Sequence, residues 1–358
     1  MFRTAAALLL SGTLVFSATL PQPEIKSAGP MAFGPNGILF VGDSIGAAVF
    51  AIDTHDNIKA AAPVAGIHFT DIDRQIAGML GIGADQLLIN DIKVNPVSKR
   101  VYISVSRGRG LDAIPVILRT DSFGHLTEFA PDRNSYTTAL LPNPPVSNPR
   151  AENRNPRLET ITQLGFADGK VLVAGLSNEE FSSNLRVIPF PFRSAFHNVD
   201  QGSSVEIYHG SHGDYETQSP VRTFFPWMIG SKRYIVAAYT CTPLVIIPVG
   251  DLRPGAKVTG KTIAELGMGN RPLDMIPYRK DNHDFILLAN SYRGVMKLSA
   301  ENLDRYEAIT EPAQLEGVPY KRVAALKGVR RLTSLDESTA LILKDAQDGL
   351  DLESIPLP

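Results

Sequence analysis

The feature that most constrains the fold is a unit of short apolar strands and polar turns that recurs along the chain. In its clearest copy, Asn95-Pro96 begins a turn, and Val101 to Val105 and Val116 to Leu118 have the branched residues typical of strands. A tight turn such as Pro35-Asn36-Gly37 separates the first strand of a unit from the second. Six units are present, at Met31 to Asp53, Ile89 to Phe129, Ile161 to Phe192, Thr223 to Leu252, Leu273 to Leu303 and Leu332 to Leu357.

Repetition of this kind, with no long helix between the units, predicts sheets arranged radially around one axis. We expect an all-β, six-bladed β-propeller that forms a single domain over residues 21–358. The alternative is seven blades, with the extra unit in Ala62 to Leu88, although Asp71 to Leu80 favours a short amphipathic helix. The segment from Pro23 to Phe33 is the candidate for the strand that closes the ring, because an open ring would expose sheet edges.

Two irregular stretches between the units are expected to be insertions. Residues 130–155 hold five prolines interleaved with Asn and Arg, which indicates a long extended excursion across one face. Residues 190–216 are predicted to contain one strand, at Ser204 to Tyr208. These insertions are expected to cover the mouth of the central channel.

Composition excludes several classes of protein. The 35 Lys+Arg and 37 Asp+Glu give a formal net charge of −2, which argues against a protein that coats nucleic acid, and no nucleic-acid-binding, nucleotide-binding or haem-attachment motif is present. Cys241 is the only cysteine, so no intrachain disulfide can form. Because it lies in an apolar run, it is expected to be a small buried residue between strands.

The N-terminus has the pattern of a secretion signal. Arg3 precedes the apolar run Ala5 to Val15, and small residues follow it, so residues 1–20 are predicted to be a cleaved signal peptide. The run is shorter than a membrane span requires, and Pro21 and Pro23 come directly after it. We therefore expect an exported protein, periplasmic or extracellular, with no membrane span.

Particular strings resemble known families. GPNGILFVGDSIGAAVFAID and NDIKVNPVSKRVYISVSRG resemble units of exported NHL, SMP-30 and strictosidine-synthase-like propellers, which include hydrolases, lyase-like enzymes and binding modules. SVSRGRG, AGLSNEEF and NSYRGVMK are similar to strings of an uncharacterised family of secreted bacterial proteins. In SMP-30-like enzymes an acidic and amide set above the channel holds a divalent cation. Asn90-Asp91 stands where that set would begin, so the resemblance implies Ca²⁺.

Polar residues just before the innermost strand of each blade should converge on the channel, whatever their separation in sequence. Arginines there could hold a carboxylate or phosphate, and carboxylate and amide oxygens could bind calcium. Alternatively, the charged groups pair with one another and plug the channel. The candidate ligand-binding residues are Asn90, Asp91, Arg157, Glu159, Arg222, Arg271 and Asp274, with Arg330 or Arg331, and the candidate cation ligands are Asn90, Asp91 and Glu159.

A second candidate metal site lies in a histidine-rich segment. His209 and His212, followed by Asp214, are residue types that bind zinc or copper when they fold together. Gly210 and Gly213 predict a loop here. The alternative is a solvated loop that turn hydrogen bonds stabilise.

Three functional hypotheses follow. The first is an exported module that binds a small anionic molecule or another exported protein at the channel mouth, without turnover. The second is a hydrolase in which a cation on Asn90, Asp91 and Glu159 polarises an ester or lactone carbonyl, as the SMP-30-like resemblance implies. The third is a metal or redox partner role for His209 and His212. Enzyme status stays open, because no catalytic constellation is complete.

Overall fold

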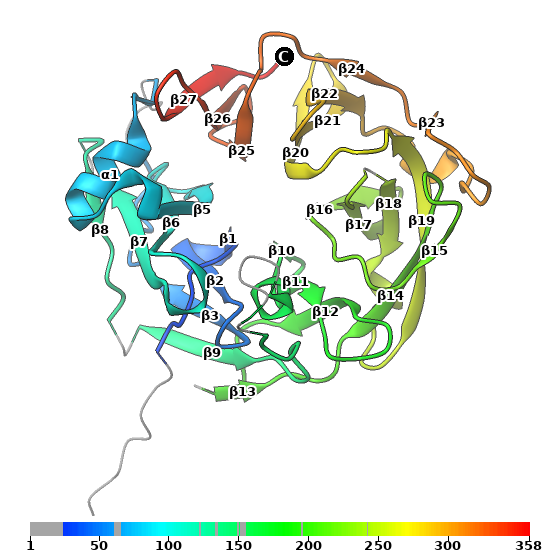
Figure 1. The fold of residues 1–358 in the computed structure, drawn as a ribbon, viewed down its shortest axis with the longest axis horizontal. Helices are drawn as coiled ribbons and strands as arrows, with labels where there is room; N and C mark the ends of the chain where they lie inside the picture. The colour runs from blue at the N-terminus through cyan, green and yellow to red at the C-terminus, as the bar shows by residue number, and fades with distance from the viewer. Residues whose placement is uncertain are drawn as a thin grey trace, which may run out of the picture.

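The computed structural model describes residues 24–60, 66–121, 123–132, 135–148, 150, 155–194, 196–241 and 243–358. The signal peptide expected at residues 1–20 lies outside these residues. Within the described ranges, no helix is both long enough and apolar enough to cross a membrane. The protein is all-β, with a propeller-like arrangement of sheets around a central channel (Figure 1).

Three of the sheets have four strands each. Each consists of three consecutive antiparallel strands and a short outer strand. Their strands are β5 (Leu87–Val94), β6 (Val101–Arg107), β7 (Ile114–Thr120) and β8 (Leu126–Glu128); β20 (Pro272–Lys280), β21 (His283–Asn290), β22 (Gly294–Ser299) and β24 (Tyr320–Arg322); and β25 (Val329–Ser334), β26 (Thr339–Asp345), β27 (Leu350–Pro356) and β4 (His68–Phe69).

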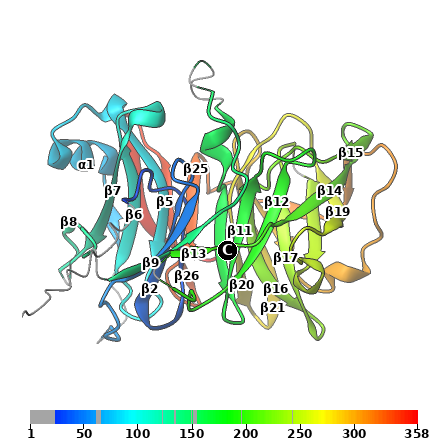
Figure 2. The same ribbon diagram turned by 90° about the horizontal axis from the view of Figure 1, so that it is seen from below.

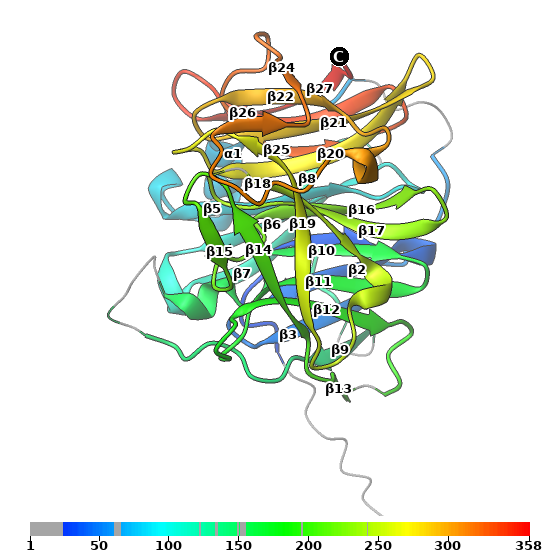
Figure 3. The ribbon, with the colours of Figure 1, turned by 90° about the vertical axis from the view of Figure 1, so that its right-hand side faces the viewer.

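The other two sheets are larger. A five-stranded sheet contains β1 (Met31–Phe33), β2 (Ile38–Asp43), β3 (Ala48–Asp53), β9 (Tyr136–Leu140) and β13 (Phe196–Asn198). A ten-stranded sheet contains β10 (Gln163–Ala167), β11 (Lys170–Leu176), β12 (Ser183–Pro189), β14 (Ser203–His209), β15 (Asp214–Glu216), β16 (Thr223–Ile229), β17 (Lys232–Ala238), β18 (Pro243–Pro248), β19 (Lys257–Leu266) and β23 (Leu315–Gly317). Two antiparallel runs of this sheet are joined by the parallel pair β14–β19, which lie side by side in Figure 3.

The innermost strands contact one another in a closed circle, in the order β1, β10, β16, β20, β25 and β5. This spatial order differs from the order in the chain, because the sheet of β5 lies between the last sheet and the first. The strands run between the two faces of the ring, as the edge-on view shows (Figure 2). Residues that precede the inner strands are therefore brought to the channel.

The apolar core lies between neighbouring sheets. The second strand of a unit is covered on both faces, and so it is apolar almost throughout: Val101, Tyr102, Ile103 and Val105 of β6 are fully buried. The predicted helix is also present, as α1 (Ile72–Leu80), and its buried residues pack against the sheets of β5 and β27. The repeat units and this helix are therefore where the sequence predicted them.

The ring is closed by a strand other than the expected one. The segment from Pro23 to Phe33 contributes β1 to the first sheet, whereas β4 pairs with β27 at the outer edge of the last sheet. Backbone hydrogen bonds continue this pairing, since Ser354 N–H donates to the carbonyl of Ile67 at 2.9 Å. The described part of Ala62 to Leu88 holds β4, α1 and a short 3₁₀ turn before β5 begins.

Both expected insertions contain strands of the sheets. Strand β9, in the proline-rich stretch of residues 130–155, pairs with β3 in the first sheet, and β13 pairs with β9 at the edge of that sheet. The strand predicted at Ser204 to Tyr208 is β14, but it pairs with β12 and β19 inside the largest sheet. These stretches therefore supply outer strands of the sheets.

Candidate functional site

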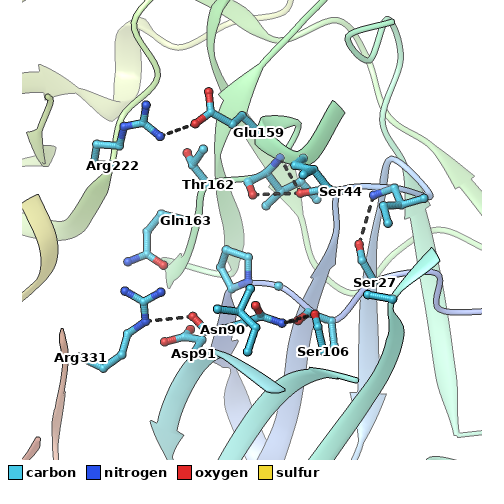
Figure 4. Close-up of a pocket in the computed structure, with 18 of the residues that line it drawn as sticks. Ser27, Ser44, Asn90, Asp91, Ser106, Glu159, Thr162, Gln163, Arg222 and Arg331 are labelled. Carbon is cyan, nitrogen blue, oxygen red and sulfur yellow. Dashed lines mark hydrogen bonds and ion pairs between the residues drawn. The ribbon is translucent and has the colours of Figure 1, made fainter. Parts of the chain in front are cut away.

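A cavity of about 500 Å³ lies at one end of the channel (Figure 4). Its lining comes from the inner strands and the turns before them, and also from the turns between β2 and β3 and between β6 and β7. The structure brings together six of the seven predicted ligand-binding residues on this lining, and Arg331 with them: Asn90, Asp91, Glu159, Arg222, Arg271 and Asp274. Arg157 is not among the lining residues; its guanidinium donates instead to the carbonyls of Ile45 and Pro145.

Three inner strands carry a β-bulge at the level of the cavity. The register shifts between Ile89 and Asp91 in β5, between Pro272 and Asp274 in β20, and between Val329 and Arg331 in β25. A bulge inserts one residue and redirects the side chains next to it. The bulges therefore place polar residues of three separate sheets at the same end of the channel.

Arg331 links these three bulges. Its Nε donates to the carbonyl of Asn90 at 2.9 Å, and its Nη1 donates to the carbonyls of Leu273 and Arg330 at 3.1 and 3.2 Å. Each of these carbonyls belongs to the extra residue of a bulge, which has no partner opposite it in the ladder. One guanidinium thus satisfies all three backbone groups.

The two channel aspartates connect neighbouring sheets. Oδ2 of Asp91 accepts from the N–H of Met31 at 2.8 Å, and Oδ2 of Asp274 accepts from the N–H of Leu332 at 3.0 Å. The Oδ1 atom of each aspartate accepts from the N–H of the residue that follows it. Gln163 accepts from Leu164 N–H in the same way, and it donates to Thr223 on the next inner strand. These side chains therefore link adjacent inner strands through hydrogen bonds.

Lys93 supplies a positive charge beside the two buried aspartates. Its Nζ lies 2.8 Å from Oδ1 of Asp91. Burial alone would lower the pKa of Lys93, but the carboxylates of Asp91 and Asp274 outweigh it and raise that pKa. Burial raises the pKa of Asp274. A hydrogen-bonded, charged layer thus separates the cavity from the other end of the channel, where Gln163 and Asp274 also line a second opening.

The remaining charges at the mouth are mainly positive. Arg222 forms an ion pair with Glu159, and its Nε donates to Thr240 Oγ1 at 3.0 Å. The guanidinium of Arg271 makes no hydrogen bond or ion pair with any described residue. Arg271 is solvent-exposed as a residue, but partial desolvation of its guanidinium and the neighbouring guanidinium of Arg222 lower its pKa, while Glu159 opposes this shift. The cavity thus holds a cation without a carboxylate partner.

Of the oxygens expected to hold calcium, both of Asp91 and Oε1 of Glu159 are already engaged. Both oxygens of Asp91 accept hydrogen bonds from the protein, and Glu159 is paired with Arg222. The Nδ2 of Asn90 donates to the carbonyl of Ala28 at 2.7 Å and to Ser106 Oγ at 2.9 Å. The ammonium of Lys93 lies where it would repel a divalent cation. This arrangement favours an anion at the mouth over a cation.

The second candidate metal site differs from its prediction at two residues, Asp214 and Cys241. His209 and His212 lie close together, with their ring centroids 3.9 Å apart. Oδ1 of Asp214 instead accepts from the N–H of Tyr215. Cys241, expected in the core, is half-buried in the turn between β17 and β18, where its φ of 61° is left-handed. The structure places this cysteine beside the two histidines.

Three residues of the mouth and of the charged layer below it were not predicted as such. Lys93 lies two positions after Asp91 on β5, so strand alternation alone would have placed it on the same face. Gln163 is the first residue of β10, and like Asp91 and Asp274 it lies on an inner strand. The sequence predicted either Arg330 or Arg331 at the channel. It could not decide between them, because the bulge that turns these neighbouring side chains in different directions cannot be recognised from the sequence.

No family model matches the sequence, and no curated protein matches it. Solved structures are similar at 11% sequence identity. They include a glucose dehydrogenase (TM-score 0.38; 93% of this chain and 97% of that chain covered), a chain of the mitotic checkpoint complex (0.40; 99% and 100%) and an aldose sugar dehydrogenase from Streptomyces coelicolor (0.35; 92% and 94%). Likeness this weak says nothing about activity or ligand.

Proposed function

We propose that this propeller binds a small anionic molecule at its channel mouth and does not turn it over. The observation that carries the proposal is the guanidinium of Arg271, which lines the cavity and has no hydrogen-bond or ion-pair partner among the described residues. The other cavity charges are balanced or engaged: Glu159 pairs with Arg222, and Lys93 pairs with Asp91. A carboxylate or phosphate would complete the charge balance at Arg271.

The shape of the site supports a small ligand. A volume of about 500 Å³ lies in the ordinary range for pockets that hold small molecules. The rim carries the hydroxyl groups of Ser27, Ser44 and Thr162, each of which already donates within the protein, to Asp43, Ile161 and Val221, so that they are left to accept from hydroxyl groups of a ligand. Arg222 points toward the same space while it is held by Glu159. The lining is therefore polar and positively charged at fixed positions.

Calorimetric titration at low salt tests this proposal. The probes are inorganic phosphate, pyrophosphate, succinate and citrate. We expect at least one of them to bind with one site per chain, and Arg271→Met to weaken its affinity by tenfold or more, about 1.4 kcal/mol. Arg330→Met is the matched control. It removes the same charge from a residue that pairs with Asp345 outside this cavity, so affinity should change little.

Two outcomes would overturn the proposal. In one, none of the four probes binds. In the other, Arg271→Met and Arg330→Met weaken binding equally, which would mean that net charge and not the site attracts the anion. The hydrolase alternative is tested in parallel with a panel of esters and lactones, with and without a chelator. Turnover that the chelator abolishes would replace the binding proposal with the SMP-30-like activity.

We also propose that the ring has six blades, with the ten-stranded sheet counted as two that are joined through β14 and β19. The closed circle of inner strands supports this count. Kinship with NHL, SMP-30 and strictosidine-synthase-like propellers, and a partner that is another exported protein, remain proposals that rest on the sequence alone.

Export to the periplasm or medium is likewise a proposal from the sequence of residues 1–20. Fractionation of a bacterial host that expresses the full chain, followed by N-terminal sequencing, tests it. Recovery of an uncleaved chain from the cytoplasm would contradict export.

A further inference from the structure

The turn between β14 and β15 brings two histidines next to the only cysteine. His209 is the last residue of β14, and His212 lies in the turn that follows (β15 and β14 are adjacent in Figure 3). Cys241 reaches the same place from the turn between β17 and β18. One ligand atom of each of these three side chains lies within 4.8 Å of the other two.

His209 is buried with a ring nitrogen that no described residue hydrogen-bonds. Only 1% of the residue is exposed, yet its Nε2 has no hydrogen-bond partner within the part of the chain that the structure describes. Buried polar side-chain atoms are normally paired, because an unsatisfied one loses its bond to water without gaining another. A bound ion that accepts the lone pair of this nitrogen would compensate for that loss.

One carboxylate oxygen lies beside the other nitrogen of both rings, although at His209 the contact has an ion-pair distance without hydrogen-bond geometry. Nδ1 of His209 lies 2.9 Å from Oε1 of Glu216, and Nδ1 of His212 contacts the same oxygen. Histidines that bind metals usually hold a carboxylate or carbonyl with the nitrogen that does not face the metal. With Nδ1 directed to Glu216, Nε2 is the nitrogen left on each ring.

We propose that His209, His212 and Cys241 bind one Zn²⁺ ion, with Glu216 orienting the two imidazoles. Two imidazoles and one thiolate are a donor set that suits zinc, and a zinc site with three protein ligands keeps a fourth position open. Binding requires the donor atoms to approach to about 3.5 Å from one another. His212 can supply this small movement, because its side chain is 47% exposed.

The backbone around the three ligands is held in place by groups that do not bind the ion. Oε1 of Glu265 accepts from the N–H of Gly210 at 2.6 Å, and the N–H of Cys241 donates to the carbonyl of Asn270 at 2.7 Å. The N–H groups of His212 and Gly213 donate to the carbonyl of His209. The loop predicted from the glycines is therefore an ordered turn, and the ligands start close to their binding positions.

The zinc site lies beside the anion cavity but uses none of its lining residues. Thr240, which accepts from Arg222, immediately precedes Cys241, and Asn270 immediately precedes Arg271. The two proposals can therefore fail separately. Anion binding depends on Arg271, whereas zinc binding depends on the three ligands.

Titration of the tag-free full chain with Zn²⁺ and with Co²⁺, after dialysis against a chelator, tests the site. We expect one ion per chain and, with Co²⁺, a thiolate-to-metal charge-transfer absorption. Cys241→Ser should abolish that absorption, and His212→Ala and Glu216→Gln should each weaken affinity by about tenfold or more. His212 is half-exposed, so its variant tests the site even if Cys241→Ser does not fold.

Matched controls separate this site from adventitious binding. His283→Ala removes an exposed histidine that pairs with Glu301, and Asp214→Asn removes the carboxylate that the sequence alone suggested as a ligand. Both variants should bind as the wild type does. The proposal is overturned if no stoichiometric ion binds, if the Co²⁺ complex lacks the thiolate absorption, or if His212→Ala and His283→Ala behave alike.

Discussion

Nε of Arg331 donates a hydrogen bond of 2.9 Å to the carbonyl oxygen of Asn90, although 241 positions separate the two residues. The same guanidinium bonds the carbonyl of Leu273, so one side chain connects β25 to the inner strands on both sides of it. Each carbonyl belongs to a bulge, which would otherwise leave a backbone acceptor without a partner at the rim of the channel. Arg331 is therefore part of the ring's structure as well as part of the cavity.

Arg331 bonds backbone carbonyls of the ring and Arg271 does not, so removing the two side chains should change stability by different amounts. Arg331→Met should lower the free energy of unfolding by about 1–3 kcal/mol, because it leaves the bulge carbonyls unsatisfied. Arg271→Met should change it by less than about 0.5 kcal/mol, since its guanidinium bonds no described residue. Urea unfolding followed by circular dichroism measures both. Equal losses in the two variants would contradict a structural role that is specific to Arg331.

Removing Lys93 from the charged layer below the cavity should lower the free energy of unfolding by more than removing Arg331. Lys93→Met would leave the buried carboxylates of Asp91 and Asp274 without their cation, and we expect a loss of about 3–5 kcal/mol. Asp91→Asn in the Lys93→Met background should recover part of this loss, because it removes one of the two unbalanced charges. Urea unfolding of the two variants at neutral pH measures the difference. A double variant less stable than the single one would show that the layer depends on hydrogen bonds and not on charge.

Glu265 predicts how stability depends on pH. Burial raises its pKa to about 7, although the N–H of Gly210 and Ser211 oppose this shift. In the unfolded chain the carboxyl has its ordinary pKa of 4.5. The folded state therefore binds more protons between these values, so this group's contribution to stability is present below about pH 4.5 and is lost as the pH rises to about 7.

The measurement compares wild type with Glu265→Gln, which keeps the size of the side chain and an oxygen that accepts from Gly210. Thermal unfolding in a chelator, between about pH 5 and 8, should show the wild type losing stability relative to the variant as the pH rises. Parallel profiles for the two proteins would mean that Glu265 does not titrate in this range.

The sequence predicts the parts of the fold that its periodicity encodes. Second strands such as β6 are covered on both faces, so they appear as unbroken apolar runs bounded by turns. Outer strands such as β9 and β14 are partly exposed, and prolines or glycines flank them, so they were interpreted as insertions. The closing strand β4 has only two residues, which is too short for any periodic signal.

The candidate site was predictable to the extent that topology alone determines it. Residues at or near the inner strands converge in any ring of this kind, and Asp91, Arg222 and Asp274 do so here, although Asp91 and Asp274 lie within their strands and only Arg222 precedes its strand. What the sequence does not contain is register. The bulges that orient Arg331, and the left-handed turn that takes Cys241 out of the core to the histidines, depend on pairings between distant strands.

Gly175 connects the packing of the ring to the shape of the cavity. A Cβ atom on this residue of β11 would lie 2.0 Å from the carbonyl oxygen of Thr160, which immediately follows the cavity residue Glu159. Gly175→Ala must therefore displace that backbone, and we expect a loss of about 2 kcal/mol or more together with weaker anion binding. Gly78→Ala is the control, since an added Cβ on exposed Gly78 of α1 meets nothing within 4 Å and should stabilise the helix by up to about 1 kcal/mol. Urea unfolding and anion titration of both variants measure the effects, and normal affinity in Gly175→Ala would show that Glu159 is not positioned by this contact.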